Sequence, residues 1–102
     1  MEAYITVAGI EDLQPGTMKS VREGGKSILL VNVDGEVHAL SNFCTHNRCY
    51  LHNGKLKGKV LTCPCHFAEF DVTSGAVVSP PAKEPLPMLP VKMDRGDILV
   101  AI

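Results

Sequence analysis

Two short segments that each pair a cysteine with a histidine constrain this chain more than any other feature of its sequence. The first is Cys44-Thr45-His46 and the second is Cys63-Pro64-Cys65-His66, with sixteen residues between His46 and Cys63. A cysteine and a histidine two or three positions apart reach one metal centre only if the backbone curls around it. The two segments therefore predict two tight loops that hold one centre from two sides.

The residue types narrow the choice of metal. Two thiolates and two imidazoles suit a tetrahedral zinc ion, or a two-iron cluster in which cysteines hold one iron and histidines the other. Zinc sites usually place two ligands of one type close together, as in Cys-x2-4-Cys and His-x3-5-His. Here each segment mixes the two types, which favours a cluster, because each loop then reaches both irons.

The spacing of the four residues, together with the segment that follows them, resembles a known family. Cys44-x-His46, sixteen residues and then Cys63-x-x-His66 resemble the Rieske 2Fe-2S signature. The tail is similar to that of the Rieske ferredoxins that supply electrons to bacterial ring-hydroxylating oxygenases; it comprises Phe70-Asp71-Val72-x-x-Gly75, Pro80-Pro81-Ala82 and Pro85-Leu86. The resemblance covers most of the chain.

This resemblance implies a cofactor and the residues around it. One Rieske 2Fe-2S cluster is expected, with the ligands Cys44, His46, Cys63 and His66. In the family, a proline-rich loop covers a third side of the cluster and excludes water from its sulfurs. Pro80 and Pro81 are expected to take that role here. The alternative is that these prolines only stiffen a surface connection.

Two further cysteines, Cys49 and Cys65, lie in the same two loops. In the Rieske proteins of quinol-oxidising respiratory complexes, cysteines at the matching positions form a disulfide across the loops, whereas most oxygenase ferredoxins lack it. The resemblance therefore predicts a disulfide between Cys49 and Cys65. The alternative is a pair of buried free thiols that act as small hydrophobic residues, which a reducing cytosol would favour.

Three residues after the second pair differ from the respiratory pattern Cys-Pro-Cys-His-Gly-Ser-x-Tyr. Ala68 and Phe70 stand where that pattern has Ser and Tyr, whose hydroxyls donate hydrogen bonds to sulfur. Such bonds stabilise the reduced cluster, so without them we expect a potential in the lower part of the Rieske range of roughly −150 to +300 mV. Phe67 stands where a glycine is usual, which leaves the local backbone path of the loop open but not the ligation.

Short apolar runs separated by turn residues predict an all-β fold, and helical periodicity is almost absent. With 102 residues, 45% of them apolar, the chain is expected to form a single Rieske domain over residues 1–102. We predict an antiparallel β-sandwich scaffold with a small cluster-binding β-subdomain inserted at about residues 42–81. Loops mounted on strands keep their geometry while the charge on iron changes.

The predicted strands and turns can be placed along the chain. The apolar run within Lys26–Val33 predicts a strand covered on both faces, and Asp34-Gly35 predicts a hairpin into a strand over 36–40. Other strands are expected over 4–8, 59–62, 91–93 and 98–102. Other turns are expected at Gln14-Pro15-Gly16, Glu23-Gly24-Gly25, Asn53-Gly54, Ser74-Gly75 and 94–97.

Charge and composition exclude several classes of function. A net charge of −1 argues against a basic surface for nucleic acid or anionic lipid. No apolar run approaches the ~20 residues that cross a bilayer, and no secretory signal is visible, so we expect a soluble, cytoplasmic protein. No nucleophile with a base and no phosphate-binding glycine loop is evident, which argues against an enzyme. His38 and His52 are interpreted as ordinary surface or half-buried residues.

An iron-sulfur site without substrate machinery predicts transfer of single electrons between partner proteins. The first hypothesis is a Rieske-type ferredoxin that takes electrons from a flavoprotein reductase and passes them to a terminal oxygenase. The second is a small Rieske subunit of a nitrite-reductase-like or respiratory complex, which the predicted disulfide favours slightly. A third, from another class, is a zinc-binding structural or interaction module.

Overall fold

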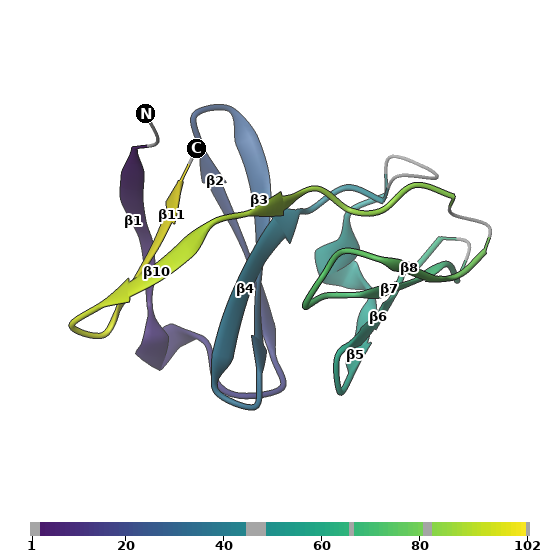
Figure 1. The fold of residues 1–102 in the computed structure, drawn as a ribbon, viewed down its shortest axis with the longest axis horizontal. Coiled ribbons are helices and arrows are strands. Elements are labelled where there is room, and N and C mark those ends of the chain that lie inside the picture. Colours follow the sequence, from purple (N-terminus) through teal and green to yellow (C-terminus); the bar gives the residue numbers. More distant parts are fainter. Residues whose placement is uncertain (1–2, 45–48, 66, 81–82, 102) are drawn as a thin grey trace.

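A computed structural model describes residues 3–44, 49–65, 67–80 and 83–101, and Figure 1 shows their arrangement. Three antiparallel sheets account for all the strands of these residues, and the helical elements among them are two single 3-10 turns. The fold is therefore all-β, as the sequence predicts. In this part of the chain no helix is long and apolar enough to cross a membrane.

The first sheet brings the two ends of the chain together. Its order is β1-β11-β10, with the bounds β1 Tyr4–Gly9, β10 Val91–Asp94 and β11 Asp97–Ala101. A 3-10 turn, η1 (Ile10–Asp12), follows β1. Arg95 and Gly96 join β10 to β11 with φ values of 50° and 86°, the left-handed backbone that a tight hairpin requires.

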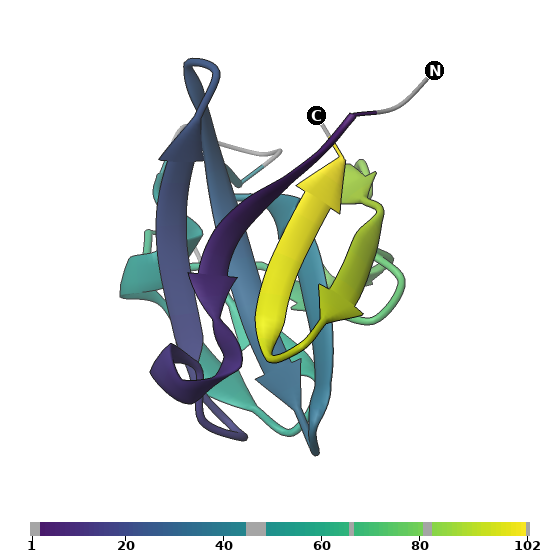
Figure 2. The ribbon, with the colours of Figure 1, turned by 90° about the vertical axis from the view of Figure 1, so that its left-hand side faces the viewer.

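The second sheet forms the other layer of the scaffold. Its order is β2-β3-β4-β9, with the bounds β2 Met18–Glu23, β3 Lys26–Val33, β4 Glu36–Ser41 and β9 Met88–Leu89. Asp34 and Gly35 turn β3 into β4 with φ values of 52° and 93°, which confirms the predicted hairpin. Figure 2 shows the first sheet lying across the second one.

β3 is buried on both faces and divides the core into two parts. Alternate residues of a strand point to opposite faces, so Ile28 and Leu30 face the first sheet while Leu29 and Val31 face away from it. The core between the two scaffold sheets contains Leu13, Ile28, Leu30, Ala39, Ile98 and Val100. The unbroken apolar run in the sequence is explained by this double burial.

The third sheet is built from residues between β4 and β9, and we call residues 42–87 the inserted segment. Its order is β5-β6-β7-β8, with the bounds β5 Lys55–Lys57, β6 Val60–Thr62, β7 Glu69–Asp71 and β8 Val77–Ser79. It lies at one end of the molecule, beside the open face of the second sheet (Figure 1). A second core joins them, comprising Leu29, Val31, Leu40, Cys44, Leu51, Leu61, Cys63, Ala68, Phe70, Val72 and Leu86.

The predicted hairpin turn at Asn53-Gly54 is wrong. A 3-10 turn, η2 (Leu51–Asn53), occupies this position, and the hairpin that follows turns at Gly58 and Lys59, between β5 and β6. Gly54 is extended, and a Cβ there would collide with the carbonyl oxygen of Thr62. The glycine is thus required for close backbone approach and not for reversing the chain.

Candidate metal centre

The two cysteines predicted to bind metal are buried in the core beneath the third sheet. Cys44 comes three residues after the end of β4 and is 4% exposed, while Cys63 directly follows β6 and is fully buried. Neither is part of a disulfide. Two thiols from different loops are therefore kept out of water within one apolar cluster.

The two loops that begin at these cysteines are closed in the same way. The Cys44 N–H donates to the carbonyl of Cys49 over 3.0 Å, and the Cys63 N–H donates to the carbonyl of Ala68 over 2.7 Å. Each bond joins a cysteine to the residue five positions later. The described ends of both loops are therefore held together by backbone hydrogen bonds.

A disulfide between Cys49 and Cys65 joins the two loops, as predicted, with 6.4 Å between the two Cα atoms. The first loop leaves the second sheet and the second loop leaves the third sheet. The bond therefore links the loop after the second sheet to the loop within the third sheet.

The imidazole half of the predicted ligand set, His46 and His66, lies outside the described residues, as does Pro81. The sulfur half can be tested against the structure. A two-iron cluster with mixed ligands needs two thiolates that belong to no disulfide and are shielded from water, one from each loop. Cys44 and Cys63 meet these requirements, so the described residues fit such a cluster.

Asn42 is a residue of this site that the sequence analysis missed. It is fully buried two positions before Cys44, and its backbone N–H donates to the Ser27 carbonyl of β3 over 3.1 Å. Its side-chain amide contacts Ser27 Oγ and His52 Nδ1, and its Oδ1 accepts the His52 backbone N–H over 2.9 Å. Asn42 thus fastens the start of the first loop to both the scaffold and η2. The local sequence gives little signal for this role, because the loop that follows, Thr45-His46-Asn47-Arg48, is itself polar.

The tail of the predicted signature fastens the proline-rich segment. The Leu86 N–H donates to the Gly75 carbonyl over 2.8 Å, and Leu86 is buried in the second core. Gly75 has φ +82°, and a Cβ on it would collide with the Leu86 carbonyl oxygen. Pro80, the member of the predicted covering pair that the structure describes, is exposed. The segment is thus anchored by Gly75 and Leu86.

Asp71 holds the turn that presents Gly75. Its Oδ1 accepts hydrogen bonds from the Thr73 hydroxyl and backbone N–H, and its backbone carbonyl accepts the Gly75 N–H over 2.7 Å. The Thr73 hydroxyl is the main reason that the pKa of the Asp71 carboxyl lies below its ordinary value of 3.8. Burial opposes this lowering, while the Thr73 N–H and the Lys59 ammonium, 3.4 Å away, add to it.

The residues that differ from the respiratory pattern occupy contrasting environments. Ala68 and Phe70 are fully buried, and neither side chain can donate a hydrogen bond. Phe67 is 73% exposed with a φ of +61°, a left-handed conformation that glycine adopts without strain. The loop therefore has an apolar interior and an aromatic side chain on its surface.

The two remaining histidines have different surroundings. His38 lies in β4, with its Nε2 3.0 Å from Glu36 Oε1 but not in hydrogen-bond geometry. His52 is exposed, yet it is bonded to Asn42 and its ring packs against Tyr50 at a centroid distance of 5.4 Å. His52 is therefore part of the framework behind the first loop.

Comparison with known proteins extends this picture. Residues 3–90 match the family model of the Rieske [2Fe-2S] domain. The ferredoxin component of the naphthalene 1,2-dioxygenase/salicylate 5-hydroxylase systems of Ralstonia sp is 32% identical over 97 residues, which cover 95% of this chain and 93% of that protein.

Solved structures show the same similarity. The ferredoxin of carbazole 1,9a-dioxygenase from Nocardioides aromaticivorans IC177 is 32% identical, with a TM-score of 0.92 and 97% of each chain covered. A chain in the complex of reduced oxygenase and oxidised ferredoxin in carbazole 1,9a-dioxygenase has the same identity and TM-score, with 96% of this chain and 92% of that chain covered.

Proposed function

Because this chain belongs to the Rieske [2Fe-2S] domain family, we propose that it is an electron carrier that passes single electrons from a flavoprotein reductase to a terminal oxygenase. Similarity to a ferredoxin component over 95% of the chain is the observation that supports this most. The family implies one Rieske 2Fe-2S cluster, which takes up one electron and gives it away again.

We assign the cluster ligands to Cys44 and His46 in the first loop and Cys63 and His66 in the second. The burial of both sulfurs and their absence from disulfides support the cysteine half of this assignment. The loops are restrained by their own hydrogen bonds, by the disulfide and by Asn42. Such restraint limits the rearrangement that accompanies a change in cluster charge and so favours rapid electron transfer.

The partners follow from the systems in which relatives work. The Ralstonia relative is a component of dioxygenase systems, and the carbazole ferredoxin has been seen in complex with its oxygenase. By analogy, a ring-hydroxylating oxygenase accepts the electron, and a flavoprotein reductase supplies it. We propose a cytoplasmic location by analogy with the ferredoxin components of dioxygenase systems.

Reconstitution tests the pathway. The cluster-loaded protein is mixed under anaerobic conditions with NADH and purified flavoprotein reductases of its own organism, and its visible absorbance is followed. Addition of air, an oxygenase and an aromatic substrate should then give hydroxylated product in proportion to the NADH consumed. The proposed function would be contradicted if none of the reductases bleached the protein. It would also be contradicted if the reduced protein supported turnover by none of the oxygenases of that organism.

Metal analysis tests the ligand assignment separately. Cys44→Ala, His46→Ala, Cys63→Ala and His66→Ala should each abolish binding of iron and inorganic sulfide. His38→Ala and His52→Ala are matched histidine controls, and Cys49→Ser with Cys65→Ser is the cysteine control; all three should retain the cluster. One bound zinc per chain without sulfide would instead support the zinc-binding module.

A further inference from the structure

An open groove runs beside the second loop, next to one of the assigned sulfur ligands. It lies between the start of β5 and the loop that follows β6, and its lining includes Lys55, Cys63 and Phe67. A side chain of another protein placed in this groove would lie close to the loop that begins at the buried Cys63. The groove thus offers a short route from the cluster to a partner.

Packing inside the protein does not explain the position of Phe67. Its ring is 73% exposed, so folding buries little of it. Its φ of +61° is a left-handed conformation that is strained for a bulky residue and free of strain for glycine. Strained residues that folding does not require tend to occur at functional sites, and exposed aromatic rings are common in protein interfaces.

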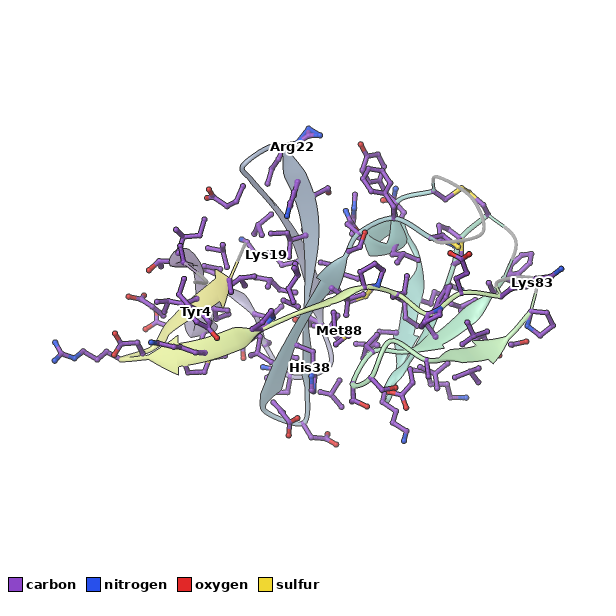
Figure 3. The ribbon with its side chains drawn as sticks, turned by 45° about the horizontal axis from the view of Figure 1, so that its top comes forward. Tyr4, Lys19, Arg22, His38, Lys83 and Met88 are labelled. Carbon is purple, nitrogen blue, oxygen red and sulfur yellow. A yellow bond between two sulfur atoms is a disulfide. The ribbon has the colours of Figure 1, made fainter. Side chains whose placement is uncertain are left out.

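Lys55 lines this groove and a second lysine of β5 lies beside it, while the carboxylates of β7, Glu69 and Asp71, stand two strands away on the same face. Lys55 and Lys57 are both exposed and, two positions apart on β5, extend from the same face of the sheet. Lys59 is exposed in the following turn, where it pairs with Asp71. Lys83 also lies at this end of the molecule, far from Lys19 and Arg22 on β2 (Figure 3).

The charges of the whole chain are divided unequally between its two ends. The inserted segment, residues 42–87, has five Lys or Arg and three Asp or Glu, whereas the rest of the chain has five and eight. The cluster end therefore carries a net +2 and the scaffold a net −3, in a protein whose total charge is only −1. Such an asymmetry orients a protein as it approaches a charged partner.

We propose that the groove with Phe67, Lys55 and Lys57 is the docking site for an acidic face of a redox-partner protein; this rests on the proposed function. An apolar side chain of the partner packs on Phe67, above the loop that carries the buried Cys63. Carboxylates around that side chain pair with Lys55 and Lys57. The lysines accelerate encounter, and the aromatic contact limits dissociation.

Small charged oxidants test the local charge without any protein partner. The reduced cluster-loaded protein is mixed with anionic ferricyanide or cationic hexaammineruthenium(III), each of which takes one electron, at increasing salt concentrations. Ferricyanide oxidation should slow as salt rises. Lys55→Glu with Lys57→Glu should slow it at least threefold at low salt and speed up oxidation by the ruthenium complex.

The matched control is Lys19→Glu with Arg22→Glu, which makes the same change in net charge on the exposed positions of β2. This control should change the ferricyanide rate less than twofold. Equal slowing by the two double variants would overturn the proposal, because net charge and not the groove would then be responsible.

Phe67 variants test the aromatic contact in the reductase and oxygenase assay described above. Phe67→Gly should raise the KM of the oxygenase for this protein at least fivefold, while the melting temperature of the variant stays the same or rises. Phe67→Tyr, which keeps an aromatic ring, should leave the KM at the wild-type value. An unchanged KM in Phe67→Gly would overturn the proposal. If the proposed function itself is wrong, the wild-type protein will also fail in this assay, while the result with small oxidants stands.

Discussion

The amide of Asn42 and the imidazole of His52 form a two-way contact behind the first metal-binding loop. His52 donates its backbone N–H to Asn42 Oδ1 over 2.9 Å, and the Asn42 amide nitrogen lies 2.8 Å from His52 Nδ1. Since the amide oxygen accepts the N–H, its nitrogen donates to the ring. His52 Nδ1 is therefore an acceptor, which places the proton of the neutral ring on Nε2.

Asn42→Ala is expected to destabilise the protein by about 2–3 kcal/mol, because it removes three hydrogen bonds and leaves their partners unsatisfied in a largely buried place. For a domain of this size, that corresponds to a fall in melting temperature of roughly 10 °C or more. His52→Ala is the matched control. It removes the ring but leaves the backbone bond to Asn42, and should cost less than about 1 kcal/mol. Equal losses in the two variants would contradict the assignment of Asn42 as the anchor.

The disulfide should stabilise the protein by about 3 kcal/mol, the amount expected for a loop closed between residues 16 positions apart. Cys49→Ser with Cys65→Ser should lower the melting temperature of the cluster-loaded protein, and a thiol reductant should lower that of the wild type to the same value. Alkylation under non-reducing conditions, followed by mass measurement, checks the bond. Modification of both Cys49 and Cys65 would show that it is absent.

Gly75→Ala should be costly for two separate reasons, and the chain provides a control that separates them. Gly75 and Gly16 both have φ +82°, but a Cβ on Gly75 would collide with the Leu86 carbonyl, whereas one on Gly16 would meet nothing within 4 Å. Gly16→Ala should therefore cost only about 1 kcal/mol of backbone strain. Gly75→Ala should cost roughly 3 kcal/mol and release the proline-rich segment. Thermal unfolding of both variants, with limited proteolysis near residue 80, measures the difference.

The strand that the sequence predicted most accurately is the one that is buried on both faces. The bounds of β3 were predicted correctly because four consecutive apolar residues must be covered on both sides, and Asp34-Gly35 fixed the turn after it. β9 was missed because it has only two residues between prolines. β2 was missed because it is an edge strand with exposed Lys19, Ser20 and Arg22, so its pattern shows little apolar character.

The site could be predicted only in part for a related reason. Donor types and their spacing are visible in a sequence, so the two cysteine and histidine pairs and the second cysteine pair were identified. The roles of Asn42 and Gly54 depend instead on contacts with Ser27 and Thr62, which lie elsewhere in the sequence and give no local signal. Gly54 in particular follows an asparagine, and this local turn signal was overridden by packing against Thr62.

Lowering the pH should remove the contribution that Asp71 makes to the stability of the folded protein. Its carboxyl has a pKa below 3.8 in the folded protein because Thr73 and Lys59 favour the charged form. The stabilisation is therefore complete above about pH 5 and is lost as the pH falls below 3.8 through the folded pKa. Asp71→Asn should cost about 1 kcal/mol at pH 7, and the gap to the wild type should narrow below pH 4. A constant gap between Asp71→Asn and the wild type across this pH range would contradict the linkage.

Restoring a hydroxyl beside the cluster should raise its reduction potential. Ala68 is fully buried in the second loop, at the position where the respiratory pattern has a serine that donates to sulfur. A hydrogen bond that favours the reduced cluster by about 1 kcal/mol raises a one-electron potential by roughly 40 mV. Voltammetry should therefore place the wild type in the lower part of the range of roughly −150 to +300 mV, with Ala68→Ser above it. Ala76→Ser, an exposed control, should leave the potential unchanged. A wild-type potential above about +150 mV would show that the missing hydroxyls do not set it.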